Sequence, residues 1–148
     1  MYFNSASQAP TVQNTCVTLL SSAKPHERFL QLQQLTEQSR KQFAKVAVLA
    51  NSEVLTGRGE ADNQQVLDFD QQMQVAGVRM LRLAPGCVCC SSKLILHTHL
   101  SRLMRLNQPD CLILELDSGA HIAQVLEQLS SPQWDQWFSK VSLFKADK

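Results

Sequence analysis

Val46-Ala47-Val48-Leu49 is a continuous run of apolar residues, preceded by Lys45 and followed by a polar region that begins at Asn51. Such a run, without alternating polar positions, is typical of a β-strand that is buried on both faces. A second run of the same kind is Cys111-Leu112-Ile113-Leu114-Glu115. Strands buried on both faces occur mainly in parallel sheets that carry helices on either side. These two runs therefore indicate a parallel sheet that is covered by helices on both faces.

Helical patterns separate the apolar runs. Pro25 favours a helix start, and Phe29, Leu32 and Leu35 follow at helical spacing. In chain order we expect a strand at 16–20, a helix at 26–43, a strand at 45–49, a short helix at 64–75, a strand at 78–83, a helix from 91 or 92 to 106, a strand at 111–115, a helix at 121–129 and a strand at 141–144. This alternation predicts an α/β fold with a mainly parallel sheet and helices on both faces.

Length and composition narrow the class of protein. The 148 residues suffice for one domain, which we place at 14–148, after a flexible polar tail at 1–13. The 14 basic and 13 acidic residues are interspersed, so no charged field favours nucleic acid or an anionic membrane surface.

The sequence also gives expectations about the cellular compartment and the oligomeric state of the chain. No apolar stretch approaches the roughly 20 residues of a membrane span, and the first residues do not form a signal peptide. We therefore expect a cytoplasmic protein. A sheet that ends this early leaves an edge or an apolar face uncovered, which favours homo-oligomers.

Three of the five cysteines lie within four positions. Pro85-Gly86 forms a turn, and Cys87-Val88-Cys89-Cys90 follows it between an expected strand and an expected helix. Ligands of open α/β sheets bind at this carboxyl end of the strands, and a helix N-terminus stabilises the thiolates that bind metal. Three thiolates suit a soft or borderline ion such as zinc, and cobalt or another divalent ion fits the same ligand set.

A fourth ligand has to come from another segment. Glu53, after a neighbouring strand, is the candidate, whereas His97 and His99 lie roughly 7 Å or more beyond the helix start at about 1.5 Å per residue. Two other interpretations of the cysteines stay open. One is a set of unliganded thiols, of which one is buried as a small apolar residue, and the other is a redox role.

Gly86-Cys87-Val88-Cys89-Cys90 resembles the Gly-Cys-x-Cys-Cys motif of the CobW-type metal-chaperone GTPases, within the CobW/HypB/UreG group. The order of the surrounding segments is similar from about Thr15 to Lys148. The matching segments are the strand at 17–20, the strand at 47–49 with Asn51-Ser52-Glu53 after it, the strand at 112–115, and Ala120 with Val125-Leu126. The resemblance implies a partial P-loop-NTPase-like fold.

The same resemblance implies a function. In the family the cysteine motif is implicated in binding zinc, cobalt or related ions for delivery to client proteins. By analogy, Cys87, Cys89 and Cys90 would bind the metal, with Glu53 as a further ligand, and a client metalloprotein would be the partner.

The nucleotide-binding motifs of the family are not matched by this sequence. The stretch that corresponds to the P-loop, 20–29, has no glycine, and Pro25 and Glu27 stand where backbone N–H groups would meet phosphate. Lys24 survives as a lysine. Neither an Asn-Lys-x-Asp segment for guanine nor a C-terminal domain follows in the sequence.

Two carboxylates correspond to the family's Glu-x-x-Gly segment. Here the sequence is Glu115-Leu116-Asp117-Ser118, with Gly119 one position late. Lys24, Glu115 and Asp117 are therefore the candidate nucleotide and magnesium residues, and we expect GTP hydrolysis to be lost. Three hypotheses follow: a metal-binding module without hydrolysis, a pseudo-GTPase interaction domain with relic cysteines, and a protein that retains nucleotide binding.

Overall fold

A computed structural model describes residues 15–21, 24–51, 60–83, 93–116 and 122–145. Strands and helices alternate along this part of the chain, as the sequence predicted. The elements are β1 (Thr15–Ser21), α1 (Pro25–Gln42), β2 (Val46–Asn51), α3 (Glu60–Val75), β3 (Arg79–Leu83), α4 (Lys93–Asn107), β4 (Cys111–Leu116), α5 (Ile122–Leu129), a 3₁₀ turn η2 (Pro132–Trp134) and β5 (Phe138–Lys145).

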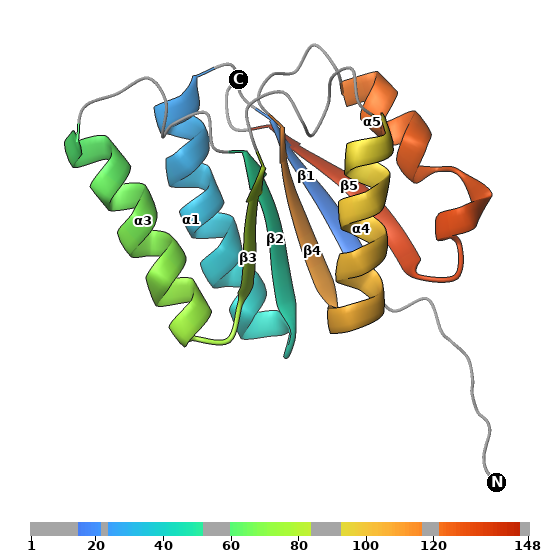
Figure 1. Cartoon of the computed structure of the whole chain (residues 1–148), viewed down its shortest axis with the longest axis horizontal. Helices are drawn as coiled ribbons and strands as arrows, with labels where there is room; N and C mark the ends of the chain where they lie inside the picture. The colour runs from blue at the N-terminus through green and yellow to red at the C-terminus, as the bar shows by residue number, and fades with distance from the viewer. Residues whose placement is uncertain (1–14, 22–23, 52–59, 84–92, 117–121, 146–148) are drawn as a thin grey trace, which may run out of the picture.

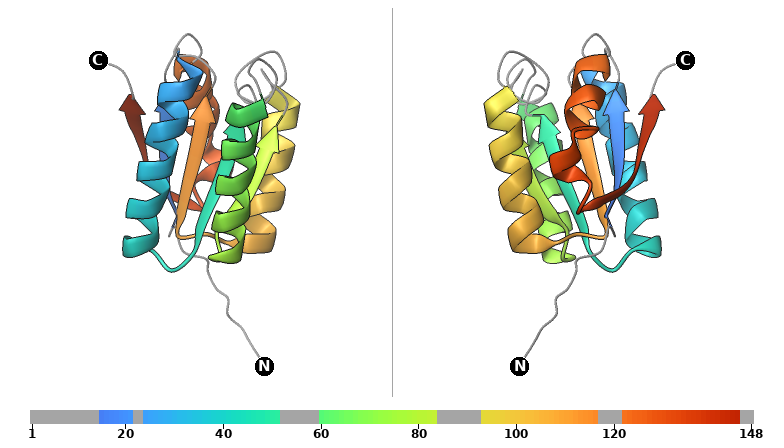
Figure 2. Two further views of the ribbon diagram at one scale, coloured as in Figure 1. Left: turned by 90° about the vertical axis from the view of Figure 1, so that its left-hand side faces the viewer. Right: turned by 90° about the vertical axis from the view of Figure 1, so that its right-hand side faces the viewer.

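The five strands form one sheet in the order β3-β2-β4-β1-β5, and every neighbouring pair is parallel. Helices α1 and α3 cover one face, and α4 and α5 cover the other (Figures 1 and 2). The predicted α/β class, with a parallel sheet and helices on both faces, is confirmed. The strand order and the two helical layers are consistent with a P-loop-NTPase-like fold.

Two apolar clusters hold the layers together. Alternate residues of a strand point to opposite faces, so one strand supplies both clusters. In β4, Leu112 and Leu114 pack with α4 and α5, whereas Ile113 packs with α1 and α3. All six β4 residues are buried, which explains why the sequence shows no polar alternation there. The sheet is therefore the common core of both layers.

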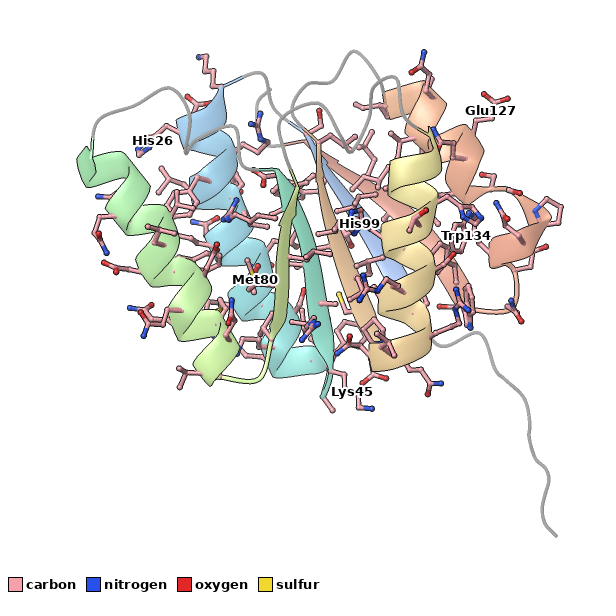
Figure 3. The ribbon with its side chains drawn as sticks, in the orientation of Figure 1. His26, Lys45, Met80, His99, Glu127 and Trp134 are labelled. Atoms are coloured by element: carbon pink, nitrogen blue, oxygen red, sulfur yellow. The ribbon has the colours of Figure 1, made fainter. Side chains whose placement is uncertain are left out.

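The ends of some elements differ from the sequence prediction. Helix α3 begins at Glu60 rather than at 64, and β5 begins at Phe138 rather than at 141. Phe138 is buried and pairs with Thr15, but the exposed Ser139 and Lys140 follow it and interrupt the apolar pattern. Trp134 is also buried, beside α4 (Figure 3). The tail at 1–13 lies outside the described residues.

Gly77 ends α3 and directs the chain into β3. Its φ of +97° is in the region that favours glycine, and the Val78 N–H donates to the Met73 carbonyl at 2.8 Å, as in a Schellman cap. An added Cβ would meet nothing within 4 Å, so only the backbone conformation opposes a side chain. We expect Gly77→Ala to lower the free energy of unfolding by about 1–2 kcal/mol. Urea denaturation measures this value, and an unchanged midpoint would contradict the prediction.

None of the helices in the described part of the chain combines the length and the apolar character that a membrane crossing requires.

Candidate functional site

Parallel strands bring their carboxyl ends to one edge of the sheet (Figure 2). Strand β2 ends at Asn51 and β3 at Leu83, and these two residues are partners in the strand register. The chain therefore leaves two adjacent strands at the same level. One strand leads into 52–59, where Glu53 lies, and the other leads into 84–92, where the cysteine motif lies.

The candidate metal ligands Cys87, Cys89, Cys90 and Glu53 lie outside the described residues, as does Asp117. Among the residues that the structure does describe, no three His, Cys, Asp or Glu side chains gather in a way that would hold a metal ion. The metal assignment thus depends on the chemistry of the cysteine motif and on the strands that lead to it.

Glu115 lies near the end of β4 and belongs to a buried ion pair. Its Oε2 accepts a hydrogen bond from Nε of Arg28 at 3.0 Å, and the two side chains are 2% and 0% exposed. Arg28 comes from the first turns of α1. A buried guanidinium needs charged or hydrogen-bonding partners, and Glu115 supplies one for Arg28 in the core.

A second arginine extends this pair into a chain of four charges. Nη1 of Arg82, on β3, lies 3.8 Å from Oε1 of Glu115. The same guanidinium binds both carboxylate oxygens of Asp70 on α3, with Nε and Nη2 at 2.6 and 3.0 Å. Strand β2 lies between β3 and β4, and its residue Ala50 is the register partner of Arg82. Because the side chain of Ala50 is only a methyl group, it leaves room for Arg82 to approach Glu115 on β4. We call Asp70, Arg82, Glu115 and Arg28 the ionic chain.

Three members of the ionic chain, Asp70, Arg82 and Arg28, were not predicted from the sequence. Arg28 stands next to Phe29 and four residues before Leu32, on the stripe of α1 that is buried. An arginine within an apolar stripe, and a glutamate that ends an apolar strand, are the signals that could have revealed such a pair.

Lys24 lies just before α1, as its N-cap residue, and the side chain makes no capping hydrogen bond. Its Nζ lies 3.7 Å from Oε2 of Glu27, in a pair whose side chains are 72% and 48% exposed. Lys24 and Glu115 thus differ in environment, because one is largely exposed and the other is enclosed with Arg28.

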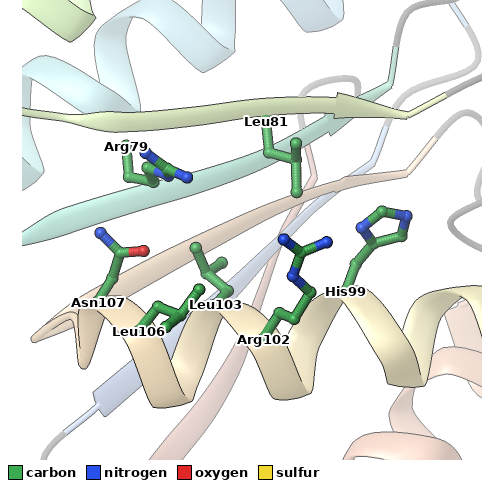
Figure 4. Close-up of a pocket in the computed structure, with 7 residues that line it drawn as sticks. All are labelled: Arg79, Leu81, His99, Arg102, Leu103, Leu106 and Asn107. Atoms are coloured by element: carbon green, nitrogen blue, oxygen red, sulfur yellow. The ribbon is translucent and has the colours of Figure 1, made fainter.

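The two histidines of α4 have different surroundings. His97 shares a hydrogen bond of 2.8 Å between its Nε2 and Oε1 of Gln133, and its ring lies 5.1 Å from that of Trp134. His99 lies beside β3, where it lines a groove (Figure 4). Neither residue joins a metal-binding group within the described part of the chain.

The two cysteines outside the motif are partners in adjacent strands. Cys16 of β1 and Cys111 of β4 share one register position, and both are free thiols. Burial raises the pKa of the Cys111 thiol, a hydrogen bond with Ser39 opposes this, and the charges of Cys16 and Asp110 raise it further. Cys111 is therefore a protonated core residue at neutral pH.

Comparison with known proteins assigns the chain to a family. Residues 30–144 match the CobW/HypB/UreG nucleotide-binding domain. The chain is also similar to the zinc chaperone YeiR of Escherichia coli (strain K12), with 31% identity over 62 residues, which are 42% of this chain and 19% of that protein. The 62 matched residues thus cover much less than two thirds of that relative. The family match begins after Lys24 and Arg28 and includes the cysteine motif and Glu115. Because the match spans most of the chain, the chain belongs to the CobW/HypB/UreG family.

Proposed function

We propose that this chain is a metal-binding module of the metallochaperone type, in which Cys87, Cys89 and Cys90 bind zinc or a similar ion and Glu53 adds a ligand. The observation that carries the proposal is the Cys-x-Cys-Cys motif in the segment between β3 and α4, at the carboxyl edge of the sheet. The metal is cargo that is passed to a client protein.

The ends of β2 and β3 support a joint contribution of Glu53 and the cysteines. Asn51 and Leu83 end adjacent parallel strands, which lie about 4.8 Å apart. An extended chain spans at most about 3.6 Å per residue, so two residues of chain reach at most about 7 Å from Asn51 and four reach at most about 14 Å from Leu83. These limits are compatible with one metal between the two segments.

The chemistry of the ligand set favours zinc. Thiolates are soft, strongly donating ligands, and zinc binds three or four of them in tetrahedral sites. The similarity to a zinc chaperone supports the same choice. Equilibrium dialysis of the freshly reduced protein against zinc is expected to give tight binding of one ion per chain. The absence of tight binding would contradict the proposal.

We further infer that the module binds neither GTP nor ATP with magnesium and therefore works without GTP hydrolysis. The Glu115 carboxylate, which corresponds to the Glu-x-x-Gly glutamate of the family, is enclosed with Arg28 and lies near Arg82. A magnesium ion there would have to compete with two guanidinium groups for one carboxylate. The missing glycines before Lys24 support the same inference, because a phosphate cradle needs them.

Isothermal titration calorimetry tests this second part separately. Titration of GTP or ATP with magnesium into the reduced protein is expected to give no heat of binding. Saturable heat at a ratio of one nucleotide per chain would show that a nucleotide site persists. The same titration with the zinc-loaded protein shows whether the metal creates such a site, and heat there would contradict the inference as well.

A further inference from the structure

A groove runs between β3 and α4, on the side of the sheet that α4 covers (Figure 4). Its volume is about 130 Å³. Three cationic or ionisable side chains line it, Arg79 from β3 and His99 and Arg102 from α4. Leucines from the same two elements supply apolar surface between them: Leu81, Leu103 and Leu106. We call this feature the β3–α4 groove.

The charge of the groove is not balanced within the described residues. Among the residues that the structure describes, no carboxylate lines the groove, and neither Arg79 nor Arg102 makes a side-chain ion pair or hydrogen bond. Arg82, three residues after Arg79 and on the opposite face of β3, is held by Asp70. Arg79 and Arg102 are both exposed residues and thus accessible to an acidic partner.

The groove borders an open edge of the sheet. Strand β3 is last in the strand order and pairs only with β2 in the described part of the chain. It lies at the front of Figure 1, with α3 on one side and α4 on the other. An edge strand presents backbone N–H and C=O groups that can pair with another strand. Leu106, with 70% of its surface exposed, adds an uncovered apolar contact.

We propose that the β3–α4 groove binds an extended acidic segment of a partner protein, which pairs with the edge of β3. Arg79 and Leu81 are two residues apart and both face the groove (Figure 4). A paired strand places its own side chains at the same spacing. The segment would therefore carry a carboxylate opposite Arg79 and an apolar side chain opposite Leu81, with a further carboxylate near Arg102.

This partner is inferred from charge and strand geometry, independently of the cysteine motif. Zinc binding and groove binding are separate properties, so either can fail without the other. A partner held in the groove would lie beside the two elements that flank residues 84–92, because β3 and α4 are the neighbours of that segment in the chain.

The test uses the full chain and a capped, fluorescently labelled peptide in which glutamate and leucine alternate with threonine. Fluorescence anisotropy is expected to show saturable binding. Arg79→Glu/Arg102→Glu is expected to weaken the affinity by about tenfold or more, because two attractions become repulsions. The matched control is Lys41→Glu/Arg105→Glu, which makes the same change of net charge at exposed positions outside the groove. This control is expected to keep the peptide affinity within about twofold of that of the unmodified protein. Circular dichroism of both variants confirms that they fold.

Two further measurements test strand pairing. Peptide methylated at alternate backbone nitrogens is expected to lose binding, and unmodified peptide is expected to slow amide hydrogen exchange of Arg79–Leu83. Equal weakening in the control variant, or equal binding of a peptide with glutamine in place of glutamate, would overturn the proposal. Displacement of the peptide by inorganic phosphate would identify a small-anion site instead. Self-association that the groove variant abolishes in sedimentation velocity would identify a second copy of the chain as the occupant.

Discussion

Replacing Arg28 by methionine is expected to lower the free energy of unfolding by about 3–5 kcal/mol. The substitution keeps most of the side-chain volume but removes the group that donates to Glu115 at 3.0 Å. Glu115, 2% exposed, would then lose this close donor, and Nη1 of Arg82 lies farther away, at 3.8 Å. A poorly compensated carboxylate would remain in the core between α1 and the sheet. Urea denaturation followed by circular dichroism measures the change.

Two controls separate the ion pair from other effects of the substitution. Arg28→Met/Glu115→Met removes both charges and is expected to recover most of the lost stability, because Arg82 keeps both contacts with Asp70. Arg40→Met breaks a surface pair with Glu37 and is expected to cost less than about 1 kcal/mol. A double variant as unstable as Arg28→Met would contradict this account, since the cost would then lie in packing.

The ionic chain links stability to the proposed loss of GTP hydrolysis. Arg28 lies in the first turn of α1, within the stretch 20–29 that corresponds to the P-loop, and Glu115 corresponds to a motif glutamate. A carboxylate that neutralises a buried arginine is no longer exposed to solvent or to an ion. The structural role of Glu115 therefore supports a module in which metal binding is independent of hydrolysis.

Much of the fold was predictable because its strands are buried on both faces. The runs at 46–49 and 111–115 have no polar alternation, and that pattern belongs to central strands of a parallel sheet. Both are central, with β2 second and β4 third in the strand order. The start of the edge strand β5 was predicted three residues too late, because an edge strand is partly exposed and mixes polar with apolar residues. The start of α3 was predicted too late for a similar reason, because the first turns of this helix are polar.

The candidate site was predictable only where its residues are contiguous. The cysteine motif stands out because three thiols lie in four positions. The partners Arg28 and Glu115 are 87 residues apart, and only the sheet topology brings them together. Nothing in the sequence around either residue specifies which arginine meets which carboxylate, so this buried ion pair was not predicted.

Serine replacement of Cys87, Cys89 and Cys90 together is expected to weaken zinc binding by about a thousandfold or more, equivalent to about 4 kcal/mol. Serine keeps the size of the side chain but replaces a thiolate by a hydroxyl, which is a poor ligand for zinc at neutral pH. Competition with a zinc chelator of known affinity measures the difference. The affinity of the unmodified protein is expected to fall as the pH is lowered, because protons compete with zinc for thiolates whose ordinary pKa is about 8.5.

The two remaining cysteines provide the matched control for this variant. Cys16→Ser/Cys111→Ala removes thiols from β1 and β4 and is expected to leave the zinc affinity unchanged, although the loss of the buried Cys111 side chain lowers stability. Zinc binding that survives the triple replacement but not this control would move the site to the other end of the sheet, where Cys16 and Cys111 are register partners. Zinc binding lost only with the triple variant would place the ligands in the segment between β3 and α4, as the motif predicts. No zinc binding by either variant or by the unmodified protein would leave the cysteines as relics, and peptide binding at the β3–α4 groove would then be the function to pursue.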